Sequence, residues 1–382
     1  MALVSDFSSY MERLNLSSTI LILAVVVILS VASQVQWRFK ASENKPSLPR
    51  KGTLYKAATG SNVNDTYPPV ETLPDFQWEK TEPLKLRPFK QTYNLTMAIS
   101  KSHVSELVEM DRNYLERINL RKQLMVDEAY SVLAAQESVK AAVDEFYTWM
   151  MGVYLPTRFP RAFQLTDDGH NLHNLATGDV SPVTSPAEPL DALRTLGTTI
   201  EDELLFLLPS PDGDGYTLQG YVNCFPAGFE PREKFNMKLR DIHIPVPSYK
   251  EKMEKSMDRF FERIEVGTFI KRANWSINTT DQLFVKKGNH LYGGEEEKPE
   301  EINPATTFMR CERQVVHRLP KTKALLLSVK TFLYPVEELK AEGSGEEMIA
   351  AIDGLKAGNA PGIHFYKRAG IWGDSLKAYL RS

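Results

Sequence analysis

The sequence predicts an α+β fold in which helices come first and an antiparallel sheet follows. Apolar residues recur at helical spacing between residues 100 and 155, and apolar and polar residues alternate beyond residue 208. The stretch 309–319 and the strongly apolar stretch 324–336 flank the short turn 320–323 and predict a hairpin. Helices and strands that are segregated along the chain in this way are typical of α+β proteins.

Length and composition limit the classes of function. The chain of 382 residues is long enough for a sizeable core, and its charged content of 25% and hydrophobic content of 42% are typical of globular proteins. The formal net charge of −3 provides no basic field, so we expect no nucleic-acid partner. Two cysteines, Cys224 and Cys311, are too few for an iron–sulfur cluster or a four-thiolate zinc site, although they could form one disulfide.

The N-terminus predicts a membrane anchor. Residues 14–37 carry no charge and form an apolar stretch long enough to cross a bilayer as one uncleaved helix. Arg13 is the one basic residue in the ten positions before this stretch, whereas six basic residues lie in positions 38–56, which places the body of the protein in the cytosol. Five N-x-S/T sequons support the alternative of a lumenal body.

The chain is therefore divided into three predicted parts. Residues 1–40 contain the anchor, and residues 41–75 form a tether rich in Pro, Ser, Asn, Gly and Lys. Residues 76–382 form the α+β domain with a single core.

The elements of this domain are predicted in order. The pattern favours helices over 100–125, 127–155, 190–208 and 248–264, with a polar loop over 165–190. In the helix over 248–264, Met253, Met257, Phe260, Phe261 and Ile264 form one apolar stripe that we expect in the core. Strands are expected over 216–225 and 268–280, before the hairpin.

His243 is the most distinctive candidate for a functional side chain. It lies between two isoleucines in "IHIPVP", and Pro245 and Pro247 predict a short, stiff, extended segment that would hold an imidazole at one angle. The alternative is a hydrogen-bonded core histidine. His317 and His364 look like surface residues, and the spacing of His170 and His173 resembles a metal pair without an evident third ligand.

Strand alternation groups further candidates. Arg272 and Asn274 share one strand face and point together toward a site or toward solvent. On the next strand Glu312 and Arg313 lie on opposite faces, and half-buried arginines need anionic partners. The acidic run 201–203 reads as a solvated face of the helix over 190–208.

Several motifs in fixed order resemble one protein family. The sequences "IHIPVP" at 242–247, "RANW" at 272–275, "ERQ" at 312–314 and "RLP" at 318–320 are similar to motifs of the haem-dependent oxidative N-demethylase alpha-subunit-like proteins. The resemblance covers most of residues 80–340. It implies haem b in a PAS-like antiparallel sheet with surrounding helices, and O2-dependent removal of a methyl group from a secondary amine as formaldehyde.

The resemblance also implies roles for individual residues. His243 matches the axial histidine and is the expected iron ligand, while Arg272 and Arg313 are the first candidates for the haem propionates. The further residues expected near the haem are Arg318 and Trp275 as cofactor-binding residues, Asp202 or Glu312 as a carboxylate that orients the imidazole, and Asn274 or Tyr221 as a polar group above the iron.

Partners and alternatives complete the prediction. No flavin or iron–sulfur motif is present, so electrons must come from a separate reductase, which a cytosolic domain anchored at the endoplasmic reticulum would meet at the membrane. The predicted function is haem-dependent oxidation of a small amine or related metabolite. The alternatives are a haem-binding sensor without turnover and a lumenal glycosyltransferase that uses Asp212 and Asp214 as a metal-binding pair.

Overall fold

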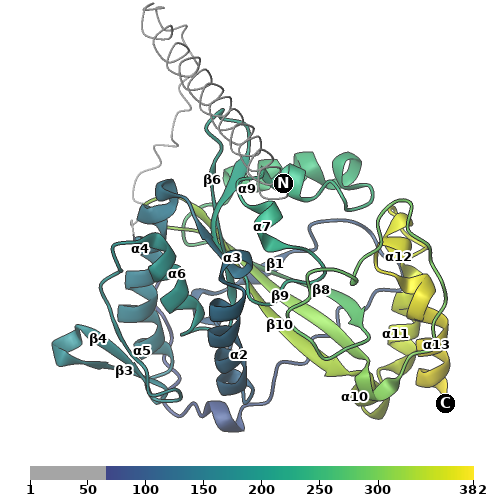
Figure 1. Ribbon diagram of the computed structural model, residues 1–382, viewed down its shortest axis with the longest axis horizontal. Coiled ribbons are helices and arrows are strands. Elements are labelled where there is room, and N and C mark those ends of the chain that lie inside the picture. The colour runs from purple at the N-terminus through teal and green to yellow at the C-terminus, as the bar shows by residue number, and fades with distance from the viewer. Residues whose placement is uncertain (1–65) are drawn as a thin grey trace, which may run out of the picture. The chain divides into compact units, whose positions relative to one another are not determined.

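A seven-stranded antiparallel sheet forms the centre of the computed structural model, which describes residues 66–382 (Figure 1). The order across the sheet is β1-β8-β9-β10-β6-β7-β2. The strands are β1 (Ser100–Ser102), β2 (Leu133–Ala135), β6 (Glu203–Pro209), β7 (Tyr216–Val222), β8 (Phe269–Asn278), β9 (Phe308–Arg318) and β10 (Leu325–Pro335). The five strands β6 to β10 therefore lie in the chain order 3-4-5-1-2, so the last strand, β10, pairs with the first, β6.

Helices cover this sheet in two groups. The N-terminal group consists of α2 (Tyr114–Asp127), α3 (Ala129–Val132), α4 (Lys140–Trp149), α5 (Leu155–Arg158) and α6 (Pro189–Gly197). The later helices are α7 (Pro231–Lys234), α8 (Leu239–Ile242), α9 (Lys255–Arg263), α10 (Val336–Ala341), α11 (Gly345–Gly354), α12 (Gly362–Tyr366) and α13 (Ala369–Arg381). In Figure 1, α2, α4, α5 and α6 lie on one side of the β9–β10 hairpin, and α10 to α13 lie on the other.

Two further kinds of element complete the fold. Single-turn π-helical segments precede two of the helices: η4 (Met150–Tyr154) before α5 and η6 (Lys250–Glu254) before α9. A small antiparallel sheet follows α5, with β3 (Phe163–Thr166), β4 (Asn171–Asn174) and β5 (Val180–Pro182). The 3₁₀ turns are η1 (Trp78–Lys80), η2 (Val104–Glu106), η3 (Glu137–Val139), η5 (Asp167–Gly169) and η7 (Pro304–Thr306).

The predicted hairpin supplies two central strands of the large sheet. Strands β9 and β10 pair without interruption from Leu325↔Arg318 to Pro335↔Phe308, and the turn between them is the predicted one. Both strands are buried for most of their length because each is covered by helices on both sides. The hairpin therefore fixes the register of β8, whose residues Phe269 to Asn278 pair along β9.

The apolar side chains form two buried clusters. One joins α2, α4 and α6 to the sheet and includes Ile118, Phe146 and Leu193. The other joins α9, α11 and α13 to the sheet and includes Trp372 and Met257. Met253, Met257, Phe261 and Ile264 are buried as the helical stripe predicted, whereas Phe260 is half-buried. The prediction of one core is thus replaced by two clusters that share one sheet.

Three predicted helices are broken by strands. The helix expected over 100–125 begins instead with β1, which pairs with β8, and α2 starts only at Tyr114. Residues 190–208 were expected as one helix, but α6 ends at Gly197 and β6 begins at Glu203, because the apolar run after Glu203 pairs with both β7 and β10. The expected helix over 127–155 is interrupted by β2, which pairs with the edge of β7. Pairing with a neighbouring strand outweighs local helical propensity at all three places.

The predicted fold class and localisation need correction. No helix within residues 66–382 is long and apolar enough to cross a bilayer, and the expected span, residues 14–37, lies outside the described residues. The fold is therefore α+β with a large antiparallel sheet, and neither a transmembrane helix preceding it nor a membrane-anchored location is supported.

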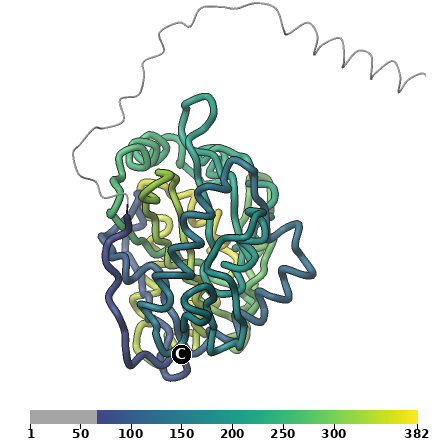
Figure 2. The backbone as a smooth tube through the Cα atoms, turned by 90° about the vertical axis from the view of Figure 1, so that its left-hand side faces the viewer, coloured from purple at the N-terminus to yellow at the C-terminus, as the bar shows by residue number. Residues whose placement is uncertain are grey.

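The connection between β6 and β7 projects from the rest of the domain and is drawn in teal in Figure 2. It carries Asp212 and Asp214, the pair considered above as a metal site. Asp212 and Asp214 both form ion pairs with Lys238, at 2.6 and 3.2 Å, and Asp214 also pairs with Arg240 at 2.5 Å. The two carboxylates are therefore neutralised by bases from the neighbouring chain segment.

Candidate functional site

The cavity that contains His243 lies over one face of strands β8 and β9. Arg272 and Asn274 alternate along β8 and both line the cavity. In the register of the sheet, Arg272 lies opposite Gln314 and Asn274 lies opposite Glu312, and these two residues line the cavity as well. Strand alternation thus brings four polar side chains to one wall, as expected for Arg272 and Asn274.

The other walls come from distant parts of the chain. They are formed by residues 242–257 around η6, by Tyr93 and Leu95, by residues 290–292, and by the end of α12. The cavity measures about 250 Å³. Apolar and aromatic groups alternate with the polar groups on its surface, which is the mixture typical of a site for an organic cofactor or ligand.

His243 presents one nitrogen to this cavity. It follows α8, and its Nδ1–H donates to the carbonyl oxygen of Leu239 at 2.7 Å, while its ring stacks on Tyr249 at 4.9 Å between centroids. Burial lowers the pKa of His243, so the imidazole is neutral. Because the proton is on Nδ1, the lone pair of Nε2 is free, which is the usual arrangement of a histidine that ligates a metal.

The local backbone at His243 differs from the prediction. The residue has φ −96° and ψ 1°, so it caps a helical turn and is not part of an extended segment. A proline restricts the residue immediately before it, which is Ile244, and leaves His243 free to cap α8. The ring is therefore oriented by its hydrogen bond and by Tyr249 rather than by an extended chain.

Two cations of the cavity, the buried Lys367 and the half-buried Arg272, form no ion pair with a carboxylate within residues 66–382. The Nε of Arg272 is buried and has no hydrogen-bond partner, and no ion pair to Arg272 exists within the described residues. Lys367, which is 4% exposed, donates from Nζ to the Asn274 amide oxygen at 3.1 Å and to the Trp275 carbonyl. Burial lowers the pKa of Lys367 to about 8. Both groups would be stabilised by an anion.

The lining has an excess of positive charge. Lys234, Arg272 and Lys367 are the basic residues around the cavity, and Glu312 is the carboxylate. Glu312 accepts from Gln314 Nε2 at 3.1 Å. The excess of two positive charges and the free imidazole nitrogen together match a ligand that carries two anionic groups and a metal.

Residues 98–377 match the family model described as haem-dependent oxidative N-demethylase, alpha subunit-like. The chain belongs to this family. The match covers all the strands of the central sheet and every wall of the cavity except Tyr93 and Leu95. Haem dependence follows from the family, and the donor set of the cavity fits haem, because His243 offers a neutral nitrogen and two unpaired cations match two propionates.

Five of the residues expected at the site do not line this cavity. Arg313 lies on the opposite face of β9, since it follows Glu312 directly, and it donates to the carbonyl of Glu106. Arg318 donates to the carbonyls of Ile264 and Phe261 at the end of β9. Each is held by backbone oxygens in the protein itself.

The remaining three of these residues also have structural partners. Asp202 is buried and accepts from Ser328 Oγ at 2.7 Å. Tyr221 Oη donates to the Ser131 carbonyl at 2.8 Å. The Trp275 ring is buried beneath Lys367, whose Nζ lies 5.0 Å from the ring centroid, so Trp275 supports the cavity wall from behind.

The acidic run 201–203 is buried, not solvated. Glu201 forms an ion pair with Lys330 at 2.9 Å, and Lys330 also pairs with Asp111 at 2.9 Å. Glu203 pairs with Arg121 at 2.7 Å. These charged side chains connect α2, β6 and β10 in the interior, and the helix-face interpretation fails because the run lies at the start of a central strand.

Two histidines outside the site were expected at the surface, and one of them, His364, is half-buried. His317, expected at the surface, is fully buried, with its ring stacked on Phe269 at 4.7 Å and its Nε2 3.3 Å from Tyr67 Oη. His170 immediately precedes β4, and His173 lies within this strand. No group of three or more potential metal-binding side chains, whether His, Cys, Asp or Glu, occurs in residues 66–382. Cys224 and Cys311 are both free.

Sequence reasoning missed several polar residues of the cavity, among them His290 and Lys367. His290 lies in the long connection between β8 and β9, and Lys367 follows α12 near the C-terminus. Neither belongs to a recognisable motif. Only the packing of α12 against the β8–β9 connection, where Tyr366 stacks on His290 at 4.3 Å, brings them to the site.

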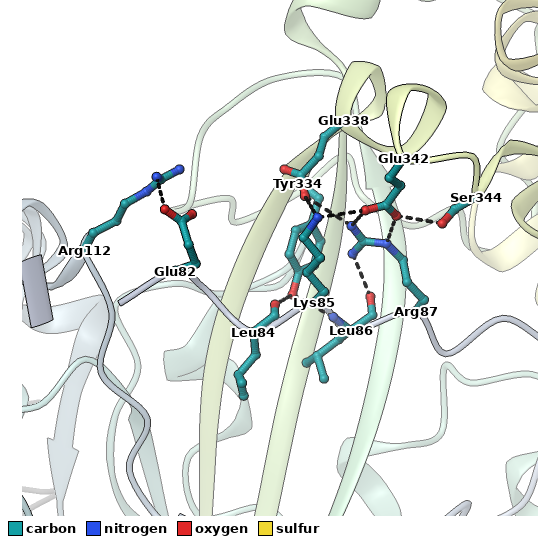
Figure 3. Close-up of polar contacts among 10 residues, drawn as sticks. All are labelled: Glu82, Leu84, Lys85, Leu86, Arg87, Arg112, Tyr334, Glu338, Glu342 and Ser344. Carbon is teal, nitrogen blue, oxygen red and sulfur yellow. Dashed lines mark hydrogen bonds and ion pairs between the residues drawn. The ribbon is translucent and has the colours of Figure 1, made fainter. Parts of the chain in front are cut away.

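A larger cavity of about 810 Å³ lies between α2 and the end of β10. Figure 3 shows part of its rim, where Arg112 pairs with Glu82 at 2.5 Å and Lys85 pairs with Glu338 at 3.7 Å. Its lining contains no histidine, so it offers no imidazole to a metal. We therefore assign the site to the cavity at His243.

Proposed function

We propose that the protein oxidises a small N-methylated amine at the cavity around His243, using haem b, O2 and two electrons from a separate reductase. The observation that supports this best is that one cavity contains both the free Nε2 of His243 and two cations, Arg272 and Lys367, that form no ion pair with a carboxylate. Bound haem would supply O2 activation, which inserts one oxygen atom into a C–H bond next to nitrogen. In balance, the methyl amine, O2, two electrons and two protons yield the demethylated amine, formaldehyde and water.

His243, Arg272 and Lys367 are the residues that would hold the haem. His243 Nε2 would bind the iron, and its Nδ1–H bond to Leu239 keeps the imidazole in the required tautomer. Arg272 and Lys367 would each receive a propionate, so the role first expected for Arg313 passes to Lys367. The cavity is smaller than the roughly 300–1,000 Å³ of typical ligand sites, so we expect binding to widen it.

Glu312 and Asn274 are the residues we assign to the substrate. Glu312 is the carboxylate among the lining side chains, so it would attract a protonated amine and accept its proton before oxidation. The Asn274 amide oxygen is engaged by Lys367, which leaves the Asn274 NH2 group to donate into the cavity. The two side chains lie opposite each other on β8 and β9 and can therefore contact one small molecule together.

The first test is an absorption spectrum of the full-length protein supplied with haem, in ferric, reduced and CO-bound forms. We expect a Soret band with a CO shift typical of histidine ligation in the wild type and in His173→Ala, a histidine variant outside the cavity. The band should be lost in His243→Ala. A colourless wild type, or a band unchanged in His243→Ala, would contradict the assignment.

A second measurement separates an enzyme from a haem sensor. With a reducing system present, N-methylated amines should stimulate consumption of reductant and release formaldehyde, and Glu312→Gln should reduce this turnover at least tenfold while keeping the Soret band. A haem protein that binds O2 but releases no formaldehyde with any amine tested would favour the sensor.

A further inference from the structure

His290 contributes a second imidazole to the cavity from a different wall. It belongs to the connection between β8 and β9, whereas His243 belongs to the segment between α8 and α9. The His290 ring stacks on Tyr366 with 4.3 Å between centroids and an interplanar angle of 27°. This stacking fixes the plane of the ring, so His290 is a positioned group.

The surroundings of His290 determine its tautomer. Nδ1 is buried and has no hydrogen-bond partner, and it packs so closely on Gly228 that a Cβ at that glycine would lie 3.0 Å from it. A neutral imidazole carries its proton on either Nδ1 or Nε2. A proton on Nδ1 would be a buried donor without an acceptor, and this costs more free energy than leaving Nδ1 as an unbonded acceptor. The proton therefore resides on Nε2, the nitrogen left to face the cavity.

His290 remains neutral in this setting. Burial lowers its pKa to about 3, and the positive charges of Lys367, Arg310 and Arg368 act in the same direction. The two cavity histidines are thus neutral but opposite in tautomer. His243 offers a lone pair to the cavity, and His290 offers an N–H donor.

We propose that His290 is a catalytic residue that donates a hydrogen bond from Nε2–H to the small polar ligand of the haem iron, such as O2. The inference rests on the proposed function, because it requires haem ligated by His243. An imidazole with its proton on Nε2 has no lone pair there for the metal, so His290 is assigned as a donor and not as a second iron ligand. Donors of this kind decide how a haem pocket treats O2.

The test compares two probes of the iron in the haem-loaded, full-length protein. Azide, an anion, is titrated into the ferric form and CO, which accepts hydrogen bonds weakly, into the ferrous form. The variants are His290→Leu, which removes the donor, and His290→Gln, which retains one. Loss of a hydrogen bond to a charged ligand should weaken azide binding by about 10- to 100-fold in His290→Leu.

The expected pattern is specific. CO affinity should change less than about threefold in His290→Leu, and His290→Gln should restore most of the azide affinity. Equal weakening of azide and CO, or unchanged azide binding, would overturn the donor assignment. A ferric spectrum that changes from six-coordinate low spin to high spin in His290→Leu would make His290 an iron ligand and also overturn it.

The Soret band tests the proposed function, and azide binding tests the role of His290. A wild type without a Soret band refutes both proposals, whereas a normal Soret band with unaltered azide binding refutes only the role of His290. The unfolding temperature of each variant shows whether the fold is kept, and His290→Gln provides the comparison if His290→Leu is unstable.

Discussion

Cations in the interior and at the site differ in how their charge is compensated. Lys330 is fully buried but has two carboxylates, Asp111 and Glu201, at 2.9 Å each. Arg272 is a cation with a buried, unbonded Nε and no carboxylate at ion-pair distance within the described chain. Burial of an uncompensated charge is costly, and it lowers the pKa of Arg272. The site therefore holds a charge that an anionic ligand would satisfy.

Replacement of Arg272 by Met should have opposite effects on the stability of the haem-free protein and on its affinity for haem. We expect the haem-free protein to keep or gain stability, by up to about 1 kcal/mol, because an uncompensated buried charge is removed. Haem affinity should fall at least tenfold, because a charge-assisted hydrogen bond to a propionate is lost. The measurements are chemical denaturation of the apo-protein and haem titration.

Lys330→Met is the matched control for this prediction. It should destabilise the apo-protein by about 3–5 kcal/mol, because two buried carboxylates lose their partner. Its effect on haem affinity should be small. Similar loss of stability in both variants would show that Arg272 is structural and would contradict its assignment to the ligand.

Elements far apart in the chain are joined by polar contacts at the end of β10. Figure 3 shows Arg87 reaching Glu342, just after α10, through two hydrogen bonds, from Nε at 2.5 Å and from Nη2 at 3.0 Å, with Nη2 also 3.3 Å from Glu338. The guanidinium lies 4.4 Å from the centroid of the Tyr334 ring. This arrangement attaches the segment before β1 to the hairpin and to α10.

The Arg87–Glu342 pair predicts a pH-dependent contribution to stability. The hydrogen bond from Arg87 lowers the pKa of Glu342 from 4.5 to about 2. The folded state therefore favours the charged form, so the stabilisation is present above pH 4.5 and is lost as the pH falls toward 2. Glu342→Gln should lower the free energy of unfolding at pH 7 by about 1 kcal/mol.

The measurement is denaturant unfolding of wild type and Glu342→Gln at several pH values. The difference between the two should shrink below pH 4.5 and vanish near pH 2. Glu346→Gln is a suitable control, since its pair with Arg381 is largely exposed. A difference that stays constant from pH 7 to pH 3 would show that the charge of Glu342 is not responsible.

At the scale of the whole molecule, the cavity lies where several distant segments meet. Strands β8 and β9 supply its floor, α12 and Tyr93 come from near the two ends of the described chain, and the segment around η6 closes it. A ligand that contacts all of these segments binds only the folded state. Its binding free energy is then added to the stability of the fold.

Haem should therefore raise the unfolding temperature of the full-length protein. At a free haem concentration about 100 times the dissociation constant, the gain is about 2.7 kcal/mol, which corresponds to several degrees for a domain of this size. His243→Ala should show little of this shift, whereas His173→Ala should show all of it. Thermal unfolding followed by circular dichroism, with and without haem, provides the measurement.

The sequence by itself determined the features that depend on local pattern. Alternation along β8 placed Arg272 and Asn274 on one face, the hairpin and its turn were predicted in place, and ordered motifs indicated the family that the match over residues 98–377 confirms. These features depend on neighbours in the chain, so a single sequence reveals them.

Tertiary structure alone decided the features that depend on distant segments. Pairing with β7 and β10 turned the expected helix at Glu203 into a strand, and the packing of α12 brought Lys367 and His290 to the cavity. Local sequence does not encode such contacts, because a buried charge or ring is stabilised by partners that lie tens to hundreds of residues away. The tautomer of His243 is set within its own segment, by the carbonyl of Leu239 four residues earlier. The tautomer of His290, by contrast, follows from the packing of its ring against Gly228 and Tyr366, which only the tertiary structure brings together.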